Sequence, residues 1–296
     1  MSGEEFRSGY AAIVGRPNVG KSTLLNALLK QKLAITTPKP QTTRHRIMGI
    51  LTHEAFQIVL LDTPGLFTPG CTLQSMMVRT ALETMRGADV VLVLIEATEE
   101  NDHFEPSIIA EFRTLNQPVL LVINKIDLVT KERILPLIAE CKAIFPFAEF
   151  VPISALYSDG LDDLLRTIVS YLPKGELLYS EDMLTDQSER FFVSELIREV
   201  VFNRFKEEVP YSATVKVVEF KKRKKLYIRA DIFVERDSQK AILIGEGGAA
   251  LKEVGQLARK QIEAFLEEPV FLDLWVKVRR RWRNRQDDVK ELEYSL

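Results

Sequence analysis

The chain has 296 residues, enough for two domains of ordinary size, and its formal net charge is −2. Residues 1–189 hold 17 Lys and Arg against 24 Asp and Glu, whereas residues 190–296 hold 23 against 18. This basic excess predicts a polyanionic partner for the second part. The apolar runs are too short to cross a bilayer, and the two cysteines lack metal or redox spacing. These features argue against a membrane-spanning or disulfide-stabilised protein, and we expect a cytoplasmic one.

A phosphate-binding loop is expected directly after the first apolar run, residues 10–14. Residues 15–22 read GRPNVGKS, which has the Walker A spacing, and a helix is expected to follow. The glycines let backbone N–H groups converge on phosphates, the lysine reaches the β- and γ-phosphates, and the serine hydroxyl binds Mg²⁺. The nucleotide-binding candidates of this loop are Gly15, Asn18, Val19, Gly20, Lys21, Ser22 and Thr23.

Five further apolar runs alternate with helical stretches, apart from one hairpin. They cover residues 47–51, 57–61, 90–95, 119–123 and 150–153. The gap after the first of these five is too short for a crossover, so that strand and the next must be antiparallel. The others are almost continuously hydrophobic, which is typical of parallel strands with helices on both faces. We therefore predict an α/β domain with a mainly parallel six-stranded sheet.

A second phosphate-side motif, DTPG, follows the run at 57–61. It starts at the carboxyl edge of the sheet, where a carboxylate faces the phosphate loop. We expect Asp62 to hold Mg²⁺ through water, and the N–H of Gly65 to sense a γ-phosphate.

The motif NKID follows the run at 119–123 and predicts the base. A carboxylate accepts two N–H groups from the guanine edge but would face an acceptor nitrogen on adenine, so Asp127 favours GTP over ATP. Asn124 would tie this loop to the phosphate loop, and the stem of Lys125 would lie on the base. After the last run, the tripeptide Ser154, Ala155 and Leu156 would offer the Ala155 N–H to the guanine carbonyl.

The segment 176–189 is polar and acidic and lacks apolar periodicity, which indicates a linker between domains at 1–175 and 190–296. The second domain has the order α-β-β-α-α-β. Its first helix is expected at 191–205, and its strands at 213–220, 226–234 and 270–278.

Three segments of the second domain are candidates for nucleic-acid binding. A G-x-x-G loop lies between the two expected helices, and basic clusters lie at the hairpin tip and after the last strand, where Trp282 is available for stacking or packing. Glu246 is acidic at a loop position where Lys or Arg is commoner. The candidate residues are Ile244, Gly245, Glu246, Gly247 and Gly248 in the loop; Lys221, Lys222, Arg223, Lys224 and Lys225 at the tip; and Arg280, Arg281 and Arg283 after the last strand.

These motifs and their order resemble the translation-factor-related GTPases, and with the second domain the whole chain resembles the Era family of bacterial GTPases. The resemblance implies a P-loop GTPase domain at 1–175 followed by a type II KH domain. Residues 38–46 are similar to the family's first switch, in which a threonine, here Thr42 or Thr43, reaches Mg²⁺ only when GTP is bound.

The resemblance also implies a target, the 3′ end of 16S ribosomal RNA during assembly of the 30S subunit, and a peripheral fraction at the inner membrane. We expect a monomer. Composition by itself indicates only a polyanion. Two alternatives stay open from the sequence. One is a GTPase acting at the inner-membrane surface, since basic clusters also attract anionic lipid. The other is a nucleotide-gated RNA-binding module in which hydrolysis is incidental.

Hydrolysis is expected to use water in line with the γ-phosphate, with charge stabilised by Lys21, Asp62, Gly65, the switch threonine and Mg²⁺. Leu66 stands where Ras-like proteins carry a water-orienting glutamine, so slow intrinsic turnover is expected. Asn18 occupies the position that in related GTPases helps hold K⁺, and the corresponding hypothesis is that turnover rises with potassium.

Overall fold

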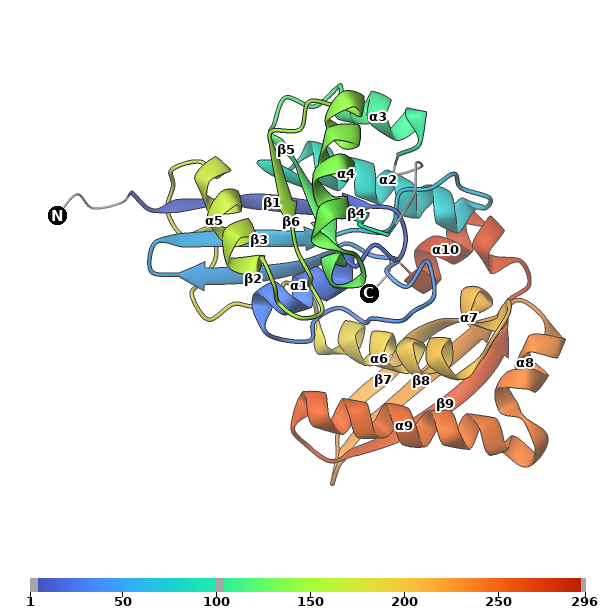
Figure 1. Ribbon diagram of the computed structural model, residues 1–296. Coiled ribbons are helices and arrows are strands. Elements are labelled where there is room, and N and C mark those ends of the chain that lie inside the picture. The colour runs from blue at the N-terminus through green and yellow to red at the C-terminus, as the bar shows by residue number, and fades with distance from the viewer. Residues whose placement is uncertain (1–4, 99–103, 294–296) are drawn as a thin grey trace. The chain divides into compact units, whose positions relative to one another are not determined.

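The computed structural model describes residues 5–98 and 104–293. These fall into two units, which are described separately below (Figure 1). Of the described residues, the first unit comprises 5–34, 43–68, 77–98 and 104–186, and the second comprises 35–42, 69–76 and 187–293. Within the described ranges, no helix is both long and apolar enough to cross a membrane.

The first unit is built on a six-stranded sheet with the order β2-β3-β1-β4-β5-β6. Only β2 runs antiparallel to its neighbour; all other pairs are parallel, as the apolar runs predicted. The strands are β1 (Arg7–Gly15), β2 (Ile47–His53), β3 (Phe56–Asp62), β4 (Val90–Glu96), β5 (Val119–Asn124) and β6 (Glu149–Pro152).

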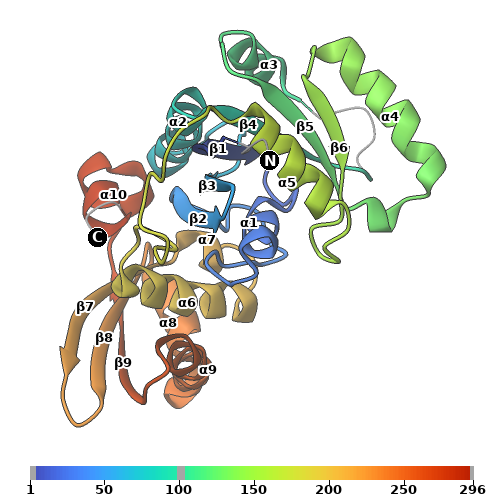
Figure 2. The ribbon, with the colours of Figure 1, turned by 90° about the vertical axis from the view of Figure 1, so that its left-hand side faces the viewer.

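Helices cover both faces of this sheet, which explains why its central strands are apolar on both sides (Figure 2). Side chains of α2, α3 and α4 share one core with alternate residues of the central strands, and Figure 2 shows α1 and α5 across the sheet from α2 and α3. The helices are α1 (Lys21–Leu29), α2 (Thr72–Arg86, of which residues 77–86 belong to this unit), α3 (Pro106–Phe112), η1 (Ile126–Leu128), α4 (Lys131–Ile144) and α5 (Leu161–Tyr171).

The chain after α5 is held against the sheet as far as Leu184, although the sequence indicated a linker at 176–189. The buried side chain of Gln57 on β3 accepts the N–H groups of Leu178 (2.8 Å) and Tyr179 (3.0 Å). Its amide donates to the carbonyl of Tyr179 (3.0 Å), and the N–H of Ile50 on β2 donates to the carbonyl of Leu184 (2.8 Å). We call residues 176–186 the strap. Hydrogen bonds to backbone groups do not depend on the type of side chain, so the strap needs no regular spacing of apolar residues to be held in place.

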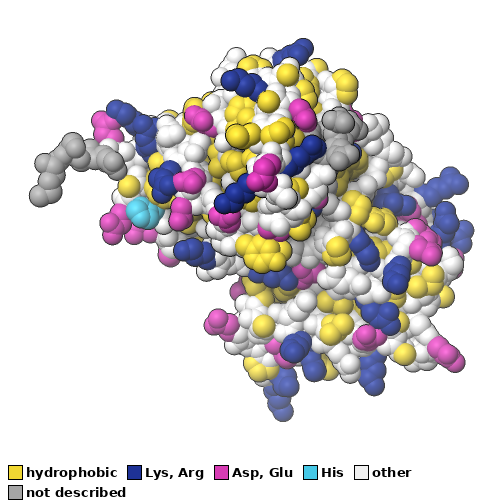
Figure 3. Space-filling model, viewed as in Figure 1, with side chains coloured by type: hydrophobic (Ala, Val, Ile, Leu, Met, Phe, Trp, Pro, Cys, Tyr) yellow, Lys and Arg dark blue, Asp and Glu magenta, His cyan; other side chains and the backbone are white. Residues whose placement is uncertain are grey.

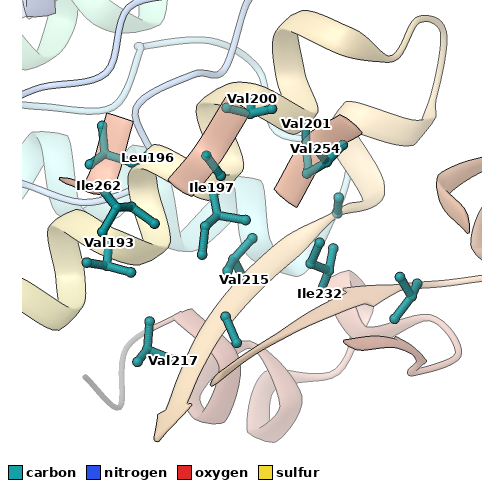
Figure 4. Packing of buried hydrophobic residues seen from close by; sticks show 14 of the residues in the cluster. Val193, Leu196, Ile197, Val200, Val201, Val215, Val217, Ile232, Val254 and Ile262 are labelled. Atoms are coloured by element: carbon teal, nitrogen blue, oxygen red, sulfur yellow. The ribbon is translucent and has the colours of Figure 1, made fainter. Parts of the chain in front are cut away.

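The second unit has a three-stranded sheet, β7-β8-β9, in which β7 and β8 are antiparallel and β8 and β9 are parallel. Apolar side chains of α6 and α9 pack on one face of this sheet, where Val193, Ile197, Val215 and Ile232 point toward one another (Figure 4). The elements are α6 (Glu189–Arg204), α7 (Val209–Ser212), β7 (Thr214–Lys222), β8 (Leu226–Val234), α8 (Asp237–Ile244), η2 (Glu246–Gly248), α9 (Ala249–Leu266), β9 (Val270–Val278), η3 (Trp282–Asn284) and α10 (Gln286–Glu293).

The predicted α-β-β-α-α-β order is present in α6, β7, β8, α8, α9 and β9. Ser188 caps α6 by accepting the N–H of Phe191 (3.2 Å), which is a typical start for a helix. Two helices, α7 and α10, were not expected from the sequence. Helix α10 is mostly polar, so it showed no clear apolar stripe.

Candidate functional site

The phosphate loop joins β1 to α1, and two of its glycines have backbone geometry that other residues rarely adopt. Gly15 has a φ of 148°, and a Cβ placed there would lie 2.4 Å from the carbonyl oxygen of Leu94. Gly20 has a φ of 99°, and a Cβ there would lie 2.2 Å from the amide nitrogen of Asn124. The loop can therefore form only with glycine at both positions, and it ends at the N-terminus of α1, a favourable place for an anion.

A lysine and a carboxylate are buried together beside this loop. The Nζ of Lys21 donates to the carbonyls of Gly15 (3.1 Å) and Arg16 (2.8 Å), and its burial lowers its pKa to about 8. Burial raises the pKa of Asp62 to about 6, against the opposing effects of Lys21 and of a hydrogen bond from Ser22. Burial thus destabilises the charged forms of both Lys21 and Asp62 relative to water. A bound phosphate and a bound cation would offset this desolvation cost.

The oxygen atoms around Asp62 fit a magnesium ion. Its Oδ2 accepts from the hydroxyl of Ser22 (2.6 Å), and that hydroxyl lies 2.8 Å from Oγ1 of Thr43. Its Oδ1 is buried and has no hydrogen-bond partner among the described residues. An unpaired buried carboxylate oxygen is unfavourable, and carboxylate and hydroxyl oxygens are ligands of the kind that Mg²⁺ takes.

The two switch threonines are placed differently. Thr43 adjoins Ser22, as described, whereas the hydroxyl of Thr42 donates to the carbonyl of Lys39 (2.7 Å) and pairs with the hydroxyl of Thr37 (2.7 Å). Only Thr43 thus lies in the oxygen cluster around Asp62.

The segment after Asp62 packs against the phosphate loop. A Cβ added to Gly65 would lie within 3 Å of Pro17, and the N–H of Leu66 donates to the carbonyl of Gly15 (3.0 Å). The side chain of Leu66 is buried in the core shared by α2, α3 and α4. This position therefore offers no polar side chain to orient a water molecule.

Asn124 joins three loops at the carboxyl edge of the sheet. Its buried amide donates to the carbonyl of Val19 in the phosphate loop (2.8 Å), and its Oδ1 accepts the N–H of Ala155 (3.0 Å). The carboxylate of Asp127 accepts from the hydroxyl of Ser154 (2.5 Å). The NKID and SAL segments, far apart in sequence, thus form one wall next to the phosphate loop.

Lys125 has a partner that no sequence motif indicated. Its backbone is left-handed, with a φ of 64°, and its ammonium forms an ion pair with Glu96. This contact and a hydrogen bond from Thr98 help to lower the pKa of Glu96. The only sequence signal for Glu96 was its place after the apolar run 90–95.

The G-x-x-G loop of the second unit lies between α8 and α9, with open space around its last two glycines. Gly247 (φ 56°) and Gly248 (φ 81°) have no atom within 4 Å of an added Cβ, so a backbone can approach them closely. Gly245, by contrast, packs against Ala250, where an added Cβ would lie 2.8 Å from the alanine Cβ. Ile244 is partly buried against the core of this unit.

A groove of about 360 Å³ begins at Gly248 and continues between α9 and β9. Leu251, Leu272 and Leu274 supply apolar lining, and Lys252 and Arg259 of α9 supply positive charge. An apolar surface for bases beside basic groups for phosphates suits a single strand of nucleic acid. Lys252 and Arg259 were not predicted as site residues, because their place on the groove depends on how α9 lies against β9.

Both basic clusters contain side chains that are paired with carboxylates. Residues 221–225 are exposed at the end of β7 and in the turn that follows it, where Figure 3 shows Lys and Arg at the lower tip. Lys221 pairs with Glu219 (2.8 Å) and Lys222 with Glu268. In the other cluster, Arg283 forms two hydrogen bonds with Glu235 (2.6 and 3.0 Å), whereas Arg280 is exposed and pairs loosely with Asp237 (3.4 Å). Trp282 is fully buried and donates to the carbonyl of Ser212 (2.9 Å), so it packs and does not stack on a ligand.

Both units of the chain match known protein families. The family model described as a 50S ribosome-binding GTPase matches residues 10–125, and the KH domain model matches residues 208–283. The chain is 47% identical to GTPase Era of Geobacter metallireducens over 298 residues, covering all of both proteins. It is 44% identical to GTPase Era of Clostridium botulinum over 292 residues, which cover 98% of this chain and 99% of the relative.

Two solved structures match almost the whole chain. One is Era in complex with MgGDPNP and nucleotides 1506–1542 of 16S ribosomal RNA, with a TM-score of 0.95 and 44% identity, covering 98% of this chain and all of that one. The other is a variant of Aquifex aeolicus Era bound to GDP and AlF₄⁻, with a TM-score of 0.92, 43% identity and the same coverage. The resemblance seen in the sequence is thereby confirmed: the chain belongs to the Era family of GTPases and carries a GTPase domain followed by a KH domain.

Proposed function

We propose that this protein is a GTP-hydrolysing switch whose KH domain binds the 3′ region of 16S ribosomal RNA and assists assembly of the 30S subunit. One observation carries the proposal: the chain matches, over 98% of its length, an Era structure that holds MgGDPNP and that RNA together. The match includes both the nucleotide loops and the groove beside the G-x-x-G loop. Neither the membrane-surface alternative nor incidental hydrolysis is favoured by an observation on the described residues.

Each nucleotide-site residue has a defined task in this proposal. Lys21 and the N–H groups of the phosphate loop hold the β- and γ-phosphates, and Asp127 and the Ala155 N–H select guanine. Bound Mg²⁺ would neutralise phosphate charge, held by Ser22, by Asp62 and, in the GTP state, by Thr43.

Thr43 is preferred to Thr42 because its hydroxyl lies beside Ser22. The N–H of Gly65 would sense the γ-phosphate. With Leu66 buried in the core, the attacking water receives no help from that side chain, and intrinsic turnover is slow. Stimulation by potassium through Asn18 remains a prediction from the sequence, as do a cytoplasmic location, a peripheral membrane fraction and a monomeric state.

The RNA side of the proposal relies on the groove and the exposed basic turn. The glycines of the G-x-x-G loop admit the RNA backbone, and Lys252, Arg259 and residues 221–225 would neutralise its phosphates. Glu246 opposes phosphate binding by charge.

Crosslinking and sequencing of RNA bound in cells tests the proposal. Gly247→Asp introduces a carboxylate at an open position, and aspartate tolerates left-handed backbone better than most residues. Asn116→Asp adds the same charge at an exposed site of the first unit and is the matched control. We expect 16S 3′-end reads from the wild type and the control, and a loss of at least tenfold for Gly247→Asp. Equal recovery of this RNA by all three proteins would contradict the proposal.

A further inference from the structure

The sheet of the second unit has a face that does not pack against α6 and α9. Along β8 and β9 every second side chain enters the core, and the intervening side chains project to the other side. Two large aromatic side chains on β9 are exposed there, Phe271 at 58% and Trp275 at 52%. Helix α10 adjoins this sheet at β7, where Lys216 donates to the carbonyl of Glu291 (2.8 Å).

Aromatic rings and arginines are grouped on this side of the sheet. Strand register places Tyr227 opposite Phe271, and their rings stack at 5.8 Å between centroids and 15° between planes. The guanidinium of Arg223 lies 4.3 Å from the centre of the Tyr227 ring, and that of Arg229 lies 5.4 Å from the Trp275 ring. We call Tyr227, Arg229, Phe271, Asp273 and Trp275 the aromatic face.

One carboxylate orients two of these rings. The Oδ2 of Asp273 accepts from the indole N–H of Trp275 (3.0 Å) and from the hydroxyl of Tyr227 (3.2 Å). The rings are thus held in place before any ligand arrives, which reduces the entropy that binding must remove. Exposed aromatic rings held in this way are unusual on a surface with no partner, because burying them is favourable.

The aromatic face is continuous with the proposed RNA groove. Phe271 lines the groove together with Leu272 and Leu274 and is also a member of the aromatic face. A KH groove clamps about four nucleotides, far fewer than the RNA segment in the matched Era structure contains. An RNA segment that leaves the groove at β9 would therefore meet Phe271 first and then Trp275, which lies further along β9.

The charged side chains of this face argue against a wholly apolar partner. Arg229 and Lys277 lie among the carboxylates of Glu219, Asp231 and Asp273, and the excess of positive charge comes from the basic residues 221–225 at the end of the face. Asp231 is buried and paired with Lys277 (2.5 Å) and Arg229 (3.8 Å), so its negative charge is compensated. Aromatic rings interleaved with arginines on a sheet are a common platform for unpaired bases.

We propose that the aromatic face is a second RNA subsite, on which unpaired bases flanking the groove-bound segment stack against Trp275 and Phe271. The inference rests on the proposed function and adds a site outside the G-x-x-G groove. Its ligand is single-stranded RNA that continues from the groove.

The test compares RNAs that reach the aromatic face with RNAs that do not. Four-nucleotide RNAs tiling nucleotides 1506–1542 would identify the segment bound by the groove, and the same segment extended by about six nucleotides at either end would reach β9. We expect Trp275→Ala to weaken binding of one extended RNA roughly 5- to 100-fold, the contribution of one stacked base, and to leave the four-nucleotide RNA unaffected. Tyr157→Ala, which removes an exposed ring from the first unit, is the matched control and should change neither.

Fluorescence gives a second readout, because the chain has only two tryptophans and Trp282 is fully buried. The extended RNA should quench the emission of Trp275 and protect it from acrylamide, and the four-nucleotide RNA should do neither. Unchanged affinity of Trp275→Ala for every extended RNA would overturn the proposal, as would equal weakening of short and extended RNAs. Weakened association with the 30S particle, with all RNA affinities unchanged, would assign the face to a protein and also overturn it. If the wild type bound none of these RNAs, the proposed function itself would fail.

Discussion

Replacing Asn124 by alanine should disrupt the nucleotide site through one side chain. The substitution removes the donor to the Val19 carbonyl (2.8 Å) and the acceptor for the Ala155 N–H (3.0 Å), both in a buried place. Each of the two backbone groups left unpaired costs about 1–3 kcal/mol, so the free energy of unfolding should fall by about 2–6 kcal/mol. Because the phosphate loop and the guanine loop then lose their common tie, we also expect GDP affinity to fall at least tenfold.

Two measurements check this prediction. Guanidinium unfolding gives the change in stability, and titration with a fluorescent GDP analogue gives the change in affinity. Asn116→Ala removes the same side chain from an exposed position and should stay within about 0.5 kcal/mol of the wild type. If Asn124→Ala behaved like Asn116→Ala in both measurements, the conclusion that Asn124 holds the three loops together by hydrogen bonds would be refuted.

Three further predictions follow from the first unit. The pKa of Asp62 is about 6 in the nucleotide-free protein, so below that pH a proton competes with Mg²⁺ for its carboxylate, and the Mg²⁺-dependent affinity for GDPNP should fall roughly tenfold per pH unit. Calorimetry from pH 5 to 7.5 measures this dependence. An equally steep dependence in Asp62→Asn would contradict the prediction. Gln57→Ala removes three hydrogen bonds to the strap, so the free energy of unfolding should fall by about 2–4 kcal/mol. Limited proteolysis should also cleave the chain within 176–186 faster than in the wild type. An unchanged cleavage rate would show that other contacts hold the strap. Asp127→Asn should reduce the affinity for GTP and raise the affinity for xanthosine triphosphate, because the exocyclic oxygen of xanthine can accept a hydrogen bond from the asparagine amide. Competition binding measures both affinities. A variant that still preferred GTP would contradict the role of Asp127 in selecting guanine.

Local patterns were sufficient to predict the order of the strands, although not the short helices α7 and α10. The short gap between the apolar runs at 47–51 and 57–61 required an antiparallel pair, which β2 and β3 form, and the predicted strands at 226–234 and 270–278 have the bounds of β8 and β9. Motifs at strand ends, such as those starting at Asp62 and Asn124, were predictable because parallel strands end at one edge of the sheet.

Features that depend on packing were not predictable from such patterns. The strap is held by a buried glutamine bonding to backbone groups, which produces no periodicity in residues 176–186. The choice between Thr42 and Thr43 depends on which hydroxyl faces Ser22, and spacing cannot distinguish adjacent residues.

The second unit shows the same limit. Alternation along β9 indicates that Phe271 and Trp275 share a face, but only the register with β8 places Tyr227 and Arg229 beside them. Trp282 lies within a basic cluster in sequence, yet the fold buries it completely.

The central claim is that the nucleotide bound by the first unit controls RNA binding by the second. The most direct measurement is the affinity of the intact protein for the RNA of nucleotides 1506–1542, taken with GDPNP and Mg²⁺, with GDP and Mg²⁺, and without nucleotide. The Era structure that holds MgGDPNP and this RNA together shows that the two ligands are compatible in that protein. We predict at least tenfold tighter RNA binding with GDPNP than with GDP, a coupling of about 1.4 kcal/mol or more. Equal RNA affinity in all three states would contradict the account of this protein as a switch.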